Sequence, residues 1–315
     1  MDASLGFLYE PCPGGARVLR VFGDSPCPVL PGTVNGLPVT EIGPYCFSAR
    51  EPRGGQRWPS DGPYHPICGE FVTEVSLPDS VQVLHSAAFY NCRQLKVLHL
   101  GPNVTSLGSD LFTNCRALEA FDLRCAPDAS TGLKKLLGAV SSDIGATFTE
   151  NGVLRACLFY PEYFEYLDEN TPAHIFNHSI EGEGYRYRQC FDGGILAFGE
   201  YDAAFDRACI GESAHSLCRI AFARLLHPFA LTEEARGNYL QYLGKHPADA
   251  VALALERRDA AALRLLGSEH LLDDPTRRDA AVQCGRLGWS EGAALLLESG
   301  PRTHRAKKSY DFDDL

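Results

Sequence analysis

A repeat of 23 residues constrains the fold of this chain more than any other feature of its sequence. Residues 77–100 read LPDSVQVLHSAAFYNCRQLKVLHL, and residues 100–123 read LGPNVTSLGSDLFTNCRALEAFDL. The pairs matched at this offset include Leu84 with Leu107, Phe89 with Phe112, Asn91 with Asn114, and Cys92 with Cys115. A fixed period in the twenties predicts a solenoid, in which each repeat buries its apolar face on the next. Solenoids commonly present an extended surface to other proteins, so the period also favours a binding function.

Each repeat divides into three parts. Strands of the L-x-x-L-x-L type occur at 95–100 and again at 118–123, and residues 72–77 (VTEVSL) are a weaker third. Pro78 ends the strand at 72–77, and Gly101–Pro102 ends the strand at 95–100. A second short extended piece follows, and a helical turn then closes the repeat with A-F-x-N-C or L-F-x-N-C. We expect the phenylalanine to lie between successive coils and the asparagine side chain to bond exposed backbone at the bend.

A degenerate copy precedes these repeats. Residues 39–50 (VTEIGPYCFSAR) match residues 81–92 (VQVLHSAAFYNC). The Gly- and Pro-rich stretch 51–70 then predicts a long surface loop between coils. Upstream, residues 16–23 (ARVLRVFG) are apolar at alternate positions, which predicts a strand that caps the solenoid.

The repeat pattern L-P-x-x-V-x-x-I-x-x-x-A-F-x-x-C-x-x-L resembles the BspA-type leucine-rich repeat. Residues 29–47 (VLPGTVNGLPVTEIGPYCF) look like the opening repeat of that family, with its V-N-G-x-P-V insert. The resemblance covers residues 7–123 and about three repeats. It implies a curved, right-handed solenoid that recognises proteins or surfaces.

The remaining patterns give an overall fold class of α+β, with four segments along the chain. We expect a leucine-rich-repeat solenoid with its capping strand at 1–126, an α+β connector at 127–200, ankyrin-like helical hairpins at 201–300, and a disordered tail at 301–315. The connector either extends the solenoid sheet or forms a small α+β domain of its own.

Within the connector, three stretches carry a local signal. Residues 131–142 (TGLKKLLGAVSS) favour a helix, and the aromatic-rich residues 152–167 favour either a strand or a buried helix. Residues 177–190 (NHSIEGEGYRYRQC) predict two extended pieces around a glycine turn.

The C-terminal part has apolar residues at helical spacing. Two units, 248–272 and 278–300, match at an offset of 31, which pairs Ala262 with Ala293. Small alanine faces permit close helix contacts, and the LLLESG end resembles the second helix of an ankyrin repeat. The T-P-L-H opening of that repeat is missing, so we describe the units as ankyrin-like.

The charge balance argues against two classes of partner. The chain has 29 Lys and Arg residues against 40 Asp and Glu residues, a net charge of −11, whereas nucleic acids and anionic membranes need a basic face. No run of about 18 apolar residues is present, the length that a membrane-spanning helix needs. We therefore expect a protein partner, no nucleic acid, no membrane and no cofactor. The sequence gives no indication of oligomeric state.

The cysteines and the N-terminus bear on the compartment. The 12 cysteines are spread from Cys12 to Cys284, unlike the dense pattern of a small secreted disulfide scaffold. Residues 1–15 lack the basic and apolar regions of a signal peptide. We expect a cytoplasmic protein with reduced thiols. The alternative is a cell-surface adhesin, like those of the BspA-type family, from which the leader has been removed.

The repeat also predicts which side chains share the concave face of the sheet. Residues 23 apart fall side by side on neighbouring strands, about 5 Å from each other. This places Ser76, His99 and Asp122 in one outward row. The predicted contact residues for a protein partner are Glu74, Ser76, Val97, His99, Ala120 and Asp122.

The same row has the composition of a hydrolase triad. Side chains that project in parallel from a ladder lack the nucleophile elbow and the oxyanion hole that such a triad needs. We therefore interpret Ser76, His99 and Asp122 as a polar binding row and predict a non-enzymatic protein. Cys92 and Cys115 stack in the same way, and we favour buried thiols over a disulfide or a metal site.

A catalytic or ligand-binding segment at 127–200 is the alternative hypothesis. Its candidate groups are His174, His178, Cys190 and Asp192. The two histidines are four residues apart, which suits a metal if the segment is helical, but the ligand set is incomplete. Convergence of the four groups would support this hypothesis, and scattered placement would contradict it.

An aromatic cluster in the same segment has two interpretations. Its members are Phe159, Tyr160, Tyr163, Phe164 and Tyr166. Aromatic side chains dominate interface hot spots, but they also bury well in a core. We favour core packing.

Overall fold

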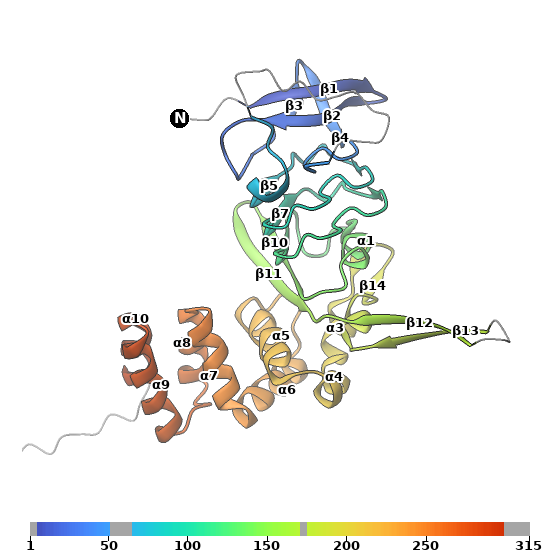
Figure 1. The fold of residues 1–315 in the computed structure, drawn as a ribbon. Helices are drawn as coiled ribbons and strands as arrows, with labels where there is room; N and C mark the ends of the chain where they lie inside the picture. The colour runs from blue at the N-terminus through green and yellow to red at the C-terminus, as the bar shows by residue number, and fades with distance from the viewer. Residues whose placement is uncertain (1–4, 51–64, 171–174, 299–315) are drawn as a thin grey trace, which may run out of the picture. The chain divides into compact units, whose positions relative to one another are not determined.

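The computed structural model describes residues 5–50, 65–170 and 175–298. Contacts divide the chain into two compact units, the first ending at Asn238 and the second beginning at Tyr239. The first unit holds all the described strands and several helices, and the second holds helices alone (Figure 1). The overall class is α+β, as predicted.

The first sheet of this unit runs in the order β1–β2–β4–β6–β8, with β3 also paired to β4. Its strands are β1 (Gly6–Cys12), β2 (Gly15–Phe22), β3 (Thr33–Val34), β4 (Leu37–Ile42), β6 (Val83–Leu84) and β8 (Ser106–Leu107). The strands β2, β4, β6 and β8 are parallel, and β1 closes the edge as the antiparallel partner of β2. The capping strand predicted at 16–23 therefore forms, together with a partner that the alternation did not reveal.

The second sheet runs in the order β11–β10–β9–β7–β5. Its strands are β5 (Glu74–Ser76), β7 (Val97–Leu100), β9 (Ala120–Leu123), β10 (Ile144–Glu150) and β11 (Val153–Tyr160). The strands β5, β7, β9 and β10 are parallel, and β11 folds back on β10 as a hairpin. From β4 to β9 the chain alternates between the two sheets, and the whole forms a β-solenoid of about five turns. A single-turn 3₁₀ helix, η1 (Gly69–Phe71), precedes β5.

The solenoid core is built by the repeated phenylalanine. Phe47 stacks on Phe89 with ring centroids 5.1 Å apart, and Phe89 stacks on Phe112 at 5.7 Å. All three side chains are buried. The predicted place of this residue, between successive coils, is confirmed.

The repeated asparagine has a different role from the predicted one. Asn91 and Asn114 adopt the left-handed region, with φ of 63° and 64°. The Nδ2 atom of Asn114 donates to Oδ1 of Asn91 at 2.7 Å. The prediction that these side chains bond backbone was wrong for this pair, because successive coils bring them within reach of each other. Asparagine suits the position because it tolerates a positive φ better than most residues.

This double role predicts different costs for two substitutions. Asn91→Ala removes the side-chain hydrogen bond and places alanine, which tolerates a positive φ less well than asparagine, at φ 63°, so we expect it to lower the free energy of unfolding by about 2 kcal/mol. Asn91→Gly removes the same hydrogen bond without the backbone strain, and we expect a loss of about 1 kcal/mol. Urea unfolding of both variants measures the difference. Equal losses would contradict the assigned strain.

The segment after the repeats continues the second sheet. It contains α1 (Leu133–Gly138), the strands β10 and β11, the hairpin β12 (Phe164–Asn170) with β13 (Ile175–Glu181), α2 (Gly184–Tyr187), and the pair β14 (Phe191–Asp192) with β15 (Ile195–Leu196). Because β10 is parallel to β9, the solenoid sheet extends into this segment. The helix predicted within 131–142 is present as α1, and the aromatic-rich stretch forms strands.

One local prediction in this segment was wrong. The second half of 177–190 is the short helix α2 and not an extended piece. Gly184 permits the close packing of this helix, because a Cβ there would lie 2.0 Å from the carbonyl oxygen of Pro161. The buried Arg188 then ties the helix to its surroundings by donating to the carbonyl oxygens of Pro161 (2.5 Å) and Ser142 (2.7 Å).

Helices complete the chain. The first unit contains α3 (Phe198–Ala203), α4 (Phe205–Gly211) and α5 (Ala214–Leu226), and α6 (Glu233–Lys245) crosses the boundary between the units. Ser213 caps α5 by accepting a hydrogen bond from the Ser216 amide. The helix α5 packs against β11, so the last strand of the solenoid sheet is covered.

The second unit contains α7 (Pro247–Glu256), α8 (Ala260–Ser268), α9 (Asp274–Arg286) and α10 (Ser290–Glu298). Asp259 and Asp273 cap α8 and α9 through their side chains. The helix α10 packs against α8 and α9, and α7 packs against the same two helices. The buried Ala250, Ala262 and Ala280 permit these contacts. The predicted helical region is confirmed, whereas its ankyrin-like character stays a prediction, and the predicted tail at 301–315 lies outside the described residues.

Candidate binding face

The six predicted contact residues lie on one outward face of the second sheet. Val97 pairs with Glu74 on one side and with Ala120 on the other. His99 in turn lies between Ser76 and Asp122, as the offset of 23 predicts. We call Glu74, Ser76, Val97, His99, Ala120 and Asp122 the sheet-face residues, and each is neither fully buried nor fully exposed.

The inward neighbours of these residues explain their orientation. Val75, Leu98 and Phe121 alternate with them along the strands and are completely buried. Because side chains of a strand point to opposite faces in turn, burial of this set turns the sheet-face residues outward. The face continues onto β10 through Thr147, the register partner of Asp122.

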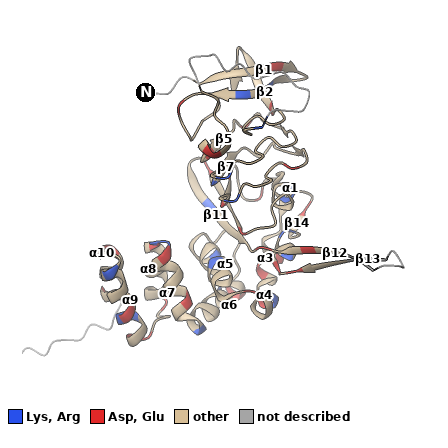
Figure 2. Cartoon of the chain, in the orientation of Figure 1, with Lys and Arg blue, Asp and Glu red and all other residues tan. Residues whose placement is uncertain are grey.

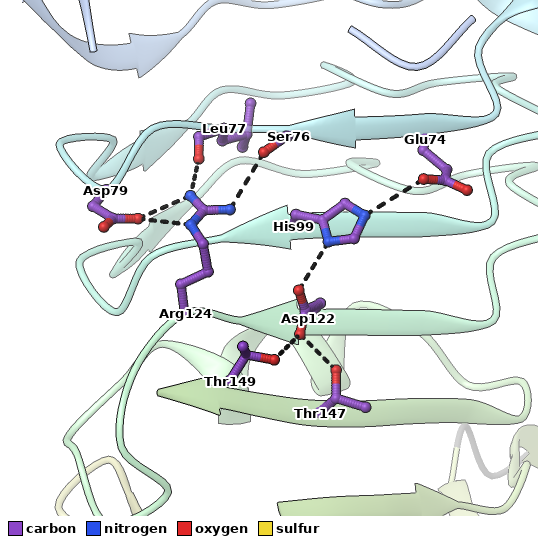
Figure 3. Close-up of polar contacts among 9 residues, drawn as sticks. All are labelled: Glu74, Ser76, Leu77, Asp79, His99, Asp122, Arg124, Thr147 and Thr149. Atoms are coloured by element: carbon purple, nitrogen blue, oxygen red, sulfur yellow. Dashed lines mark hydrogen bonds and ion pairs between the residues drawn. The ribbon is translucent and has the colours of Figure 1, made fainter. Parts of the chain in front are cut away.

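His99 is the centre of a hydrogen-bonded network on this face (Figure 3). Its Nδ1 atom lies 2.9 Å from Oδ2 of Asp122, and its Nε2 atom lies 3.6 Å from Oε2 of Glu74. The other oxygen of Asp122, Oδ1, accepts from the hydroxyls of Thr147 at 2.7 Å and Thr149 at 3.2 Å. These side chains hold one another in place across four strands.

The network shifts two pKa values in opposite directions. The hydrogen bond to Asp122 raises the pKa of His99 above its usual value, and the nearby charge of Glu74 adds to this effect. Burial by itself raises the pKa of Asp122, but hydrogen bonds from His99 and Thr147 outweigh it and hold the pKa below its usual value. Both shifts favour the charged pair.

We expect the pair of His99 and Asp122 to stabilise the fold within a limited range of pH. The raised pKa of His99 contributes below the unfolded histidine value of about 6.5, and the contribution is lost as pH rises through the folded value. The lowered pKa of Asp122 contributes above the unfolded aspartate value of about 3.9, and it is lost as pH falls through the folded value. We therefore expect wild type to exceed His99→Gln in unfolding free energy most clearly near pH 5, by about 1 kcal/mol for a partly exposed pair.

Urea unfolding of both proteins at about pH 3, 5 and 8 measures this dependence on pH, in which the full contribution is present between the two unfolded pKa values. The neighbouring groups that face His99 are Glu74, Asp122 and, through Asp122, the hydroxyls of Thr147 and Thr149. A difference that is constant over this range would contradict the assigned pKa shifts.

Arg124 fixes the end of the face near β5. Its Nε and Nη2 atoms donate to Oδ1 of Asp79 at 3.1 and 2.8 Å. Its Nη2 atom also donates to the carbonyl oxygen of Leu77, and its Nη1 atom lies 3.4 Å from Oγ of Ser76 (Figure 3). The sequence pattern did not reveal Arg124, because its long side chain reaches back across two coils to contacts that the period does not predict.

The geometry does not support a hydrolase triad. Both ring nitrogens of His99 face carboxylates, whereas Oγ of Ser76 is paired with Arg124. No hydrogen bond joins Ser76 to His99 among the described residues. The serine therefore lacks the general base that activates a nucleophile.

The four groups of the alternative catalytic hypothesis are not brought together where they are described. His174 lies outside the described residues. His178 is exposed on β13 and forms an ion pair with Glu165 at 3.4 Å. Cys190 is buried after α2, and its Sγ atom donates to the carbonyl oxygen of Arg186. Asp192 lies two residues further along the chain, in β14. Over the parts of the chain that the structure describes, no group of three His, Cys, Asp or Glu side chains could hold a metal ion.

The aromatic cluster divides between the core and the surface. Phe159, Tyr160 and Tyr163 are buried, as the favoured interpretation predicts. Phe164 and Tyr166 on β12 are 51% and 44% exposed, so core packing was wrong for these two. Within the described part of the chain, their strand pairs with β13 alone.

The stacked cysteines are separate thiols. Sγ of Cys92 donates to the carbonyl of Phe47, and Sγ of Cys115 donates to the carbonyl of Phe89, so each bonds the coil before it. Burial raises the pKa of Cys115 to about 12 and raises that of Cys92 further. Neither thiol is therefore a reactive thiolate near neutral pH.

Charge and helix length add two observations on the described part of the chain. Figure 2 shows Lys and Arg interspersed with Asp and Glu along the helices α7 to α10. A search of the described helices finds none that is both long and apolar enough to span a bilayer.

A family model agrees with the repeat geometry. Residues 68–130 match the family model described as "BspA type Leucine rich repeat region (6 copies)". Among solved structures, the crystal structure of the T. pallidum leucine rich repeat protein TpLRR is similar at 20% identity and a TM-score of 0.23, over 37% of this chain and 68% of that one. A search of curated proteins gives no significant match. The chain thus carries a BspA-type leucine-rich-repeat region followed by helices.

Proposed function

We propose that this protein is a non-enzymatic interaction module, or scaffold, that binds a protein partner through the sheet-face residues. Leucine-rich-repeat regions of this kind are typical protein-binding modules, and the match at 68–130 supports the class. The observation that carries the choice of face is the network around His99, which spans Glu74, Asp122 and Thr147.

A network of this kind suits a binding surface. His99 and Asp122 keep 30% and 20% of their side-chain surface exposed while both are hydrogen-bonded. Polar groups that are already held in place lose less conformational entropy when a partner binds. Val97 and Ala120 lie beside them and present small apolar side chains that can pack against a partner.

The charges on this face favour a basic contact from the partner. Glu74 keeps 47% of its side-chain surface exposed beside the network, and Asp79 keeps 61% beside Arg124. With a net chain charge of −11, an Arg or Lys of the partner would be steered toward this face and could pair with Glu74.

The finer parts of the proposal concern location and the helical array. We place the protein in the cytoplasm, because its 12 cysteines are present as thiols, which is typical of a reducing compartment. We also propose that the ankyrin-like hairpins α7–α8 and α9–α10 offer a second surface for proteins, since their sequences match at an offset of 31. No nucleic acid, membrane or cofactor is part of the proposed function.

A pull-down from native cytosol tests the proposed face. Wild type is compared with the double charge reversal His99→Glu and Asp122→Arg, which keeps opposite charges next to each other. We expect capture of a defined partner by wild type and at least about a tenfold loss by the variant.

A matched variant carries Thr105→Arg and Ser106→Glu, at exposed positions beside and on β8 of the other sheet. It should capture the partner as wild type does, and thermal unfolding should show that both variants are folded. Equal capture by all three proteins would contradict the proposed face.

A further inference from the structure

The hydrogen bonds between the turns that close successive coils run in one direction. They join the N–H groups of one coil to the carbonyl groups of the next: Ala87 to Ser109 (2.9 Å), Phe89 to Leu111 (3.2 Å) and Asn91 to Thr113 (2.9 Å). Each coil therefore offers carbonyl groups toward the N-terminal end of the solenoid and N–H groups toward its C-terminal end. A stack of this kind has two chemically different ends.

The carbonyl end is closed by one buried side chain. Nη1 of Arg20 donates to the carbonyl oxygens of Tyr45 (3.1 Å), Cys46 (3.0 Å) and Ser48 (2.5 Å) in the first coil. Arg20 is only 3% exposed. A positively charged donor thus satisfies the acceptors that no earlier coil covers.

The N–H end has no equivalent closure. Asp110, Phe112 and Asn114 occupy the places of the three donors in the last coil, and in the described part of the chain their backbone N–H groups have no acceptor. Their coil has the same backbone form as the one before it, because φ is 55° at Asp110 and 57° at Ala87. The coil is therefore shaped to receive another coil.

The path of the chain explains why no coil follows. After β9 the chain forms α1 and returns to the second sheet as β10. It supplies the next strand but not the turn that would stack on residues 109–114. The period also lengthens here, since Ala120 pairs with Gly145, 25 residues further on, and not with the residue 23 further on.

A cavity occupies the place of the missing turn. Its volume is about 750 Å³, and it is lined by residues 108–116, Leu118 and residues 139–142. Three carbonyl groups on the far wall are engaged elsewhere: those of Val140 and Ser142 accept from Arg188, and that of Ser141 accepts from the Tyr163 amide. The wall therefore leaves the three N–H donors of the last coil unmatched.

We propose that this cavity binds a segment of a partner protein in the turn conformation of residues 109–114, which adds a further turn to the solenoid. The segment would offer backbone carbonyl groups at alternate residues to the N–H groups of Asp110, Phe112 and Asn114. The spacing of the donors, two residues apart, selects a peptide backbone over a single anion. This site lies at the end of the stack and uses none of the sheet-face residues, so it stands apart from the function proposed above.

The existing stack also specifies a side chain of the segment. Asn114 donates to Asn91, which leaves Oδ1 of Asn114 to accept from an asparagine one turn further. Residues 109–114 (SDLFTN) perform this role toward the coil before them. A peptide that copies them is therefore the natural probe.

The first test measures binding of the fluorescent peptide GSDLFTNS to the full chain by anisotropy. We expect saturable binding that Ser141→Trp abolishes by filling the cavity. Asn114→Gly keeps the positive φ but removes the side-chain acceptor, and we expect about fivefold weaker binding. The variant Ser106→Trp, at an exposed position that does not line the cavity, should bind as wild type does.

A scrambled peptide of the same composition, without asparagine at the position that faces Asn114, should bind at least about fivefold more weakly. No saturable binding of GSDLFTNS at millimolar concentration, or binding that Ser141→Trp leaves unchanged, would overturn the proposal.

Hydrogen exchange provides a second measurement on the chain itself. The amides of Ala87, Phe89 and Asn91 are bonded between coils and should exchange slowly. The amides of Asp110, Phe112 and Asn114 should exchange fast alone and become protected when the peptide is added. Slow exchange at these three amides in the absence of peptide would overturn the proposal, because the donors would already be covered.

Discussion

Asp202→Ala is expected to lower the free energy of unfolding by about 3–5 kcal/mol. Asp202 and Arg224 form a bidentate pair in which Nε donates to Oδ1 at 2.7 Å and Nη2 donates to Oδ2 at 2.9 Å. The side chain of Arg224 is fully buried, and that of Asp202 is 5% exposed. Removing the carboxylate takes the counter-charge of this bidentate pair away from a buried cation, which costs more than the pair itself contributes.

The loss should reach the solenoid through the helices. Arg224 belongs to α5, which packs against β11, and Arg219 of the same helix lies 3.7 Å above the Phe159 ring. Urea unfolding measures the change, and Asp206→Asn at an exposed position of α4 is the control. A loss of less than about 1 kcal/mol, the range of a surface pair, would contradict the buried geometry.

Phe89→Ala is the second large effect, with an expected loss of about 3–5 kcal/mol. The ring is completely buried between those of Phe47 and Phe112. Its removal leaves a cavity in the middle of the stack that the neighbouring coils can fill only by moving apart. Their hydrogen bonds oppose such a movement, since the Phe89 amide donates to Leu111 and the Phe47 amide donates to Ala88.

Chemical unfolding measures this loss, and two further variants define its cause. Phe89→Leu keeps most of the volume and should cost less than half as much. Phe71→Ala removes a ring that is 45% exposed and should change stability by about 0.5 kcal/mol or less. A similar loss for Phe71→Ala and Phe89→Ala would show that the stack does not hold the coils together.

The repeat made the sheet predictable in detail. A constant offset between Ser76, His99 and Asp122 means that strands of identical coils pair in register, and the structure has this pairing. The same argument placed the phenylalanine stack. Prediction from the period stops at β10, because the pairing step becomes 25 residues and the side chains of Thr147 and Thr149 enter the network from a non-repeating strand.

Contacts made by long or isolated side chains were not predictable. Arg124, Arg188 and Arg224 each reach across many residues to partners that no spacing rule connects. The partners of the asparagine pair were also not predictable. The period matched Asn91 with Asn114, but local turn chemistry suggested that each side chain bonds backbone, whereas the two bond each other. The two chemically different ends of the solenoid become visible only when every backbone donor is followed to its acceptor.

Site-specific photo-crosslinking tests the central claim, that the outward face of the second sheet binds the partner, most directly. Benzoylphenylalanine replaces Ala120 on that face or Ser106 on the other sheet, and each protein is irradiated with the partner that wild type captures. The account predicts a crosslink from position 120 and none from position 106. A crosslink from position 106 alone would contradict it and place the binding surface on the opposite sheet.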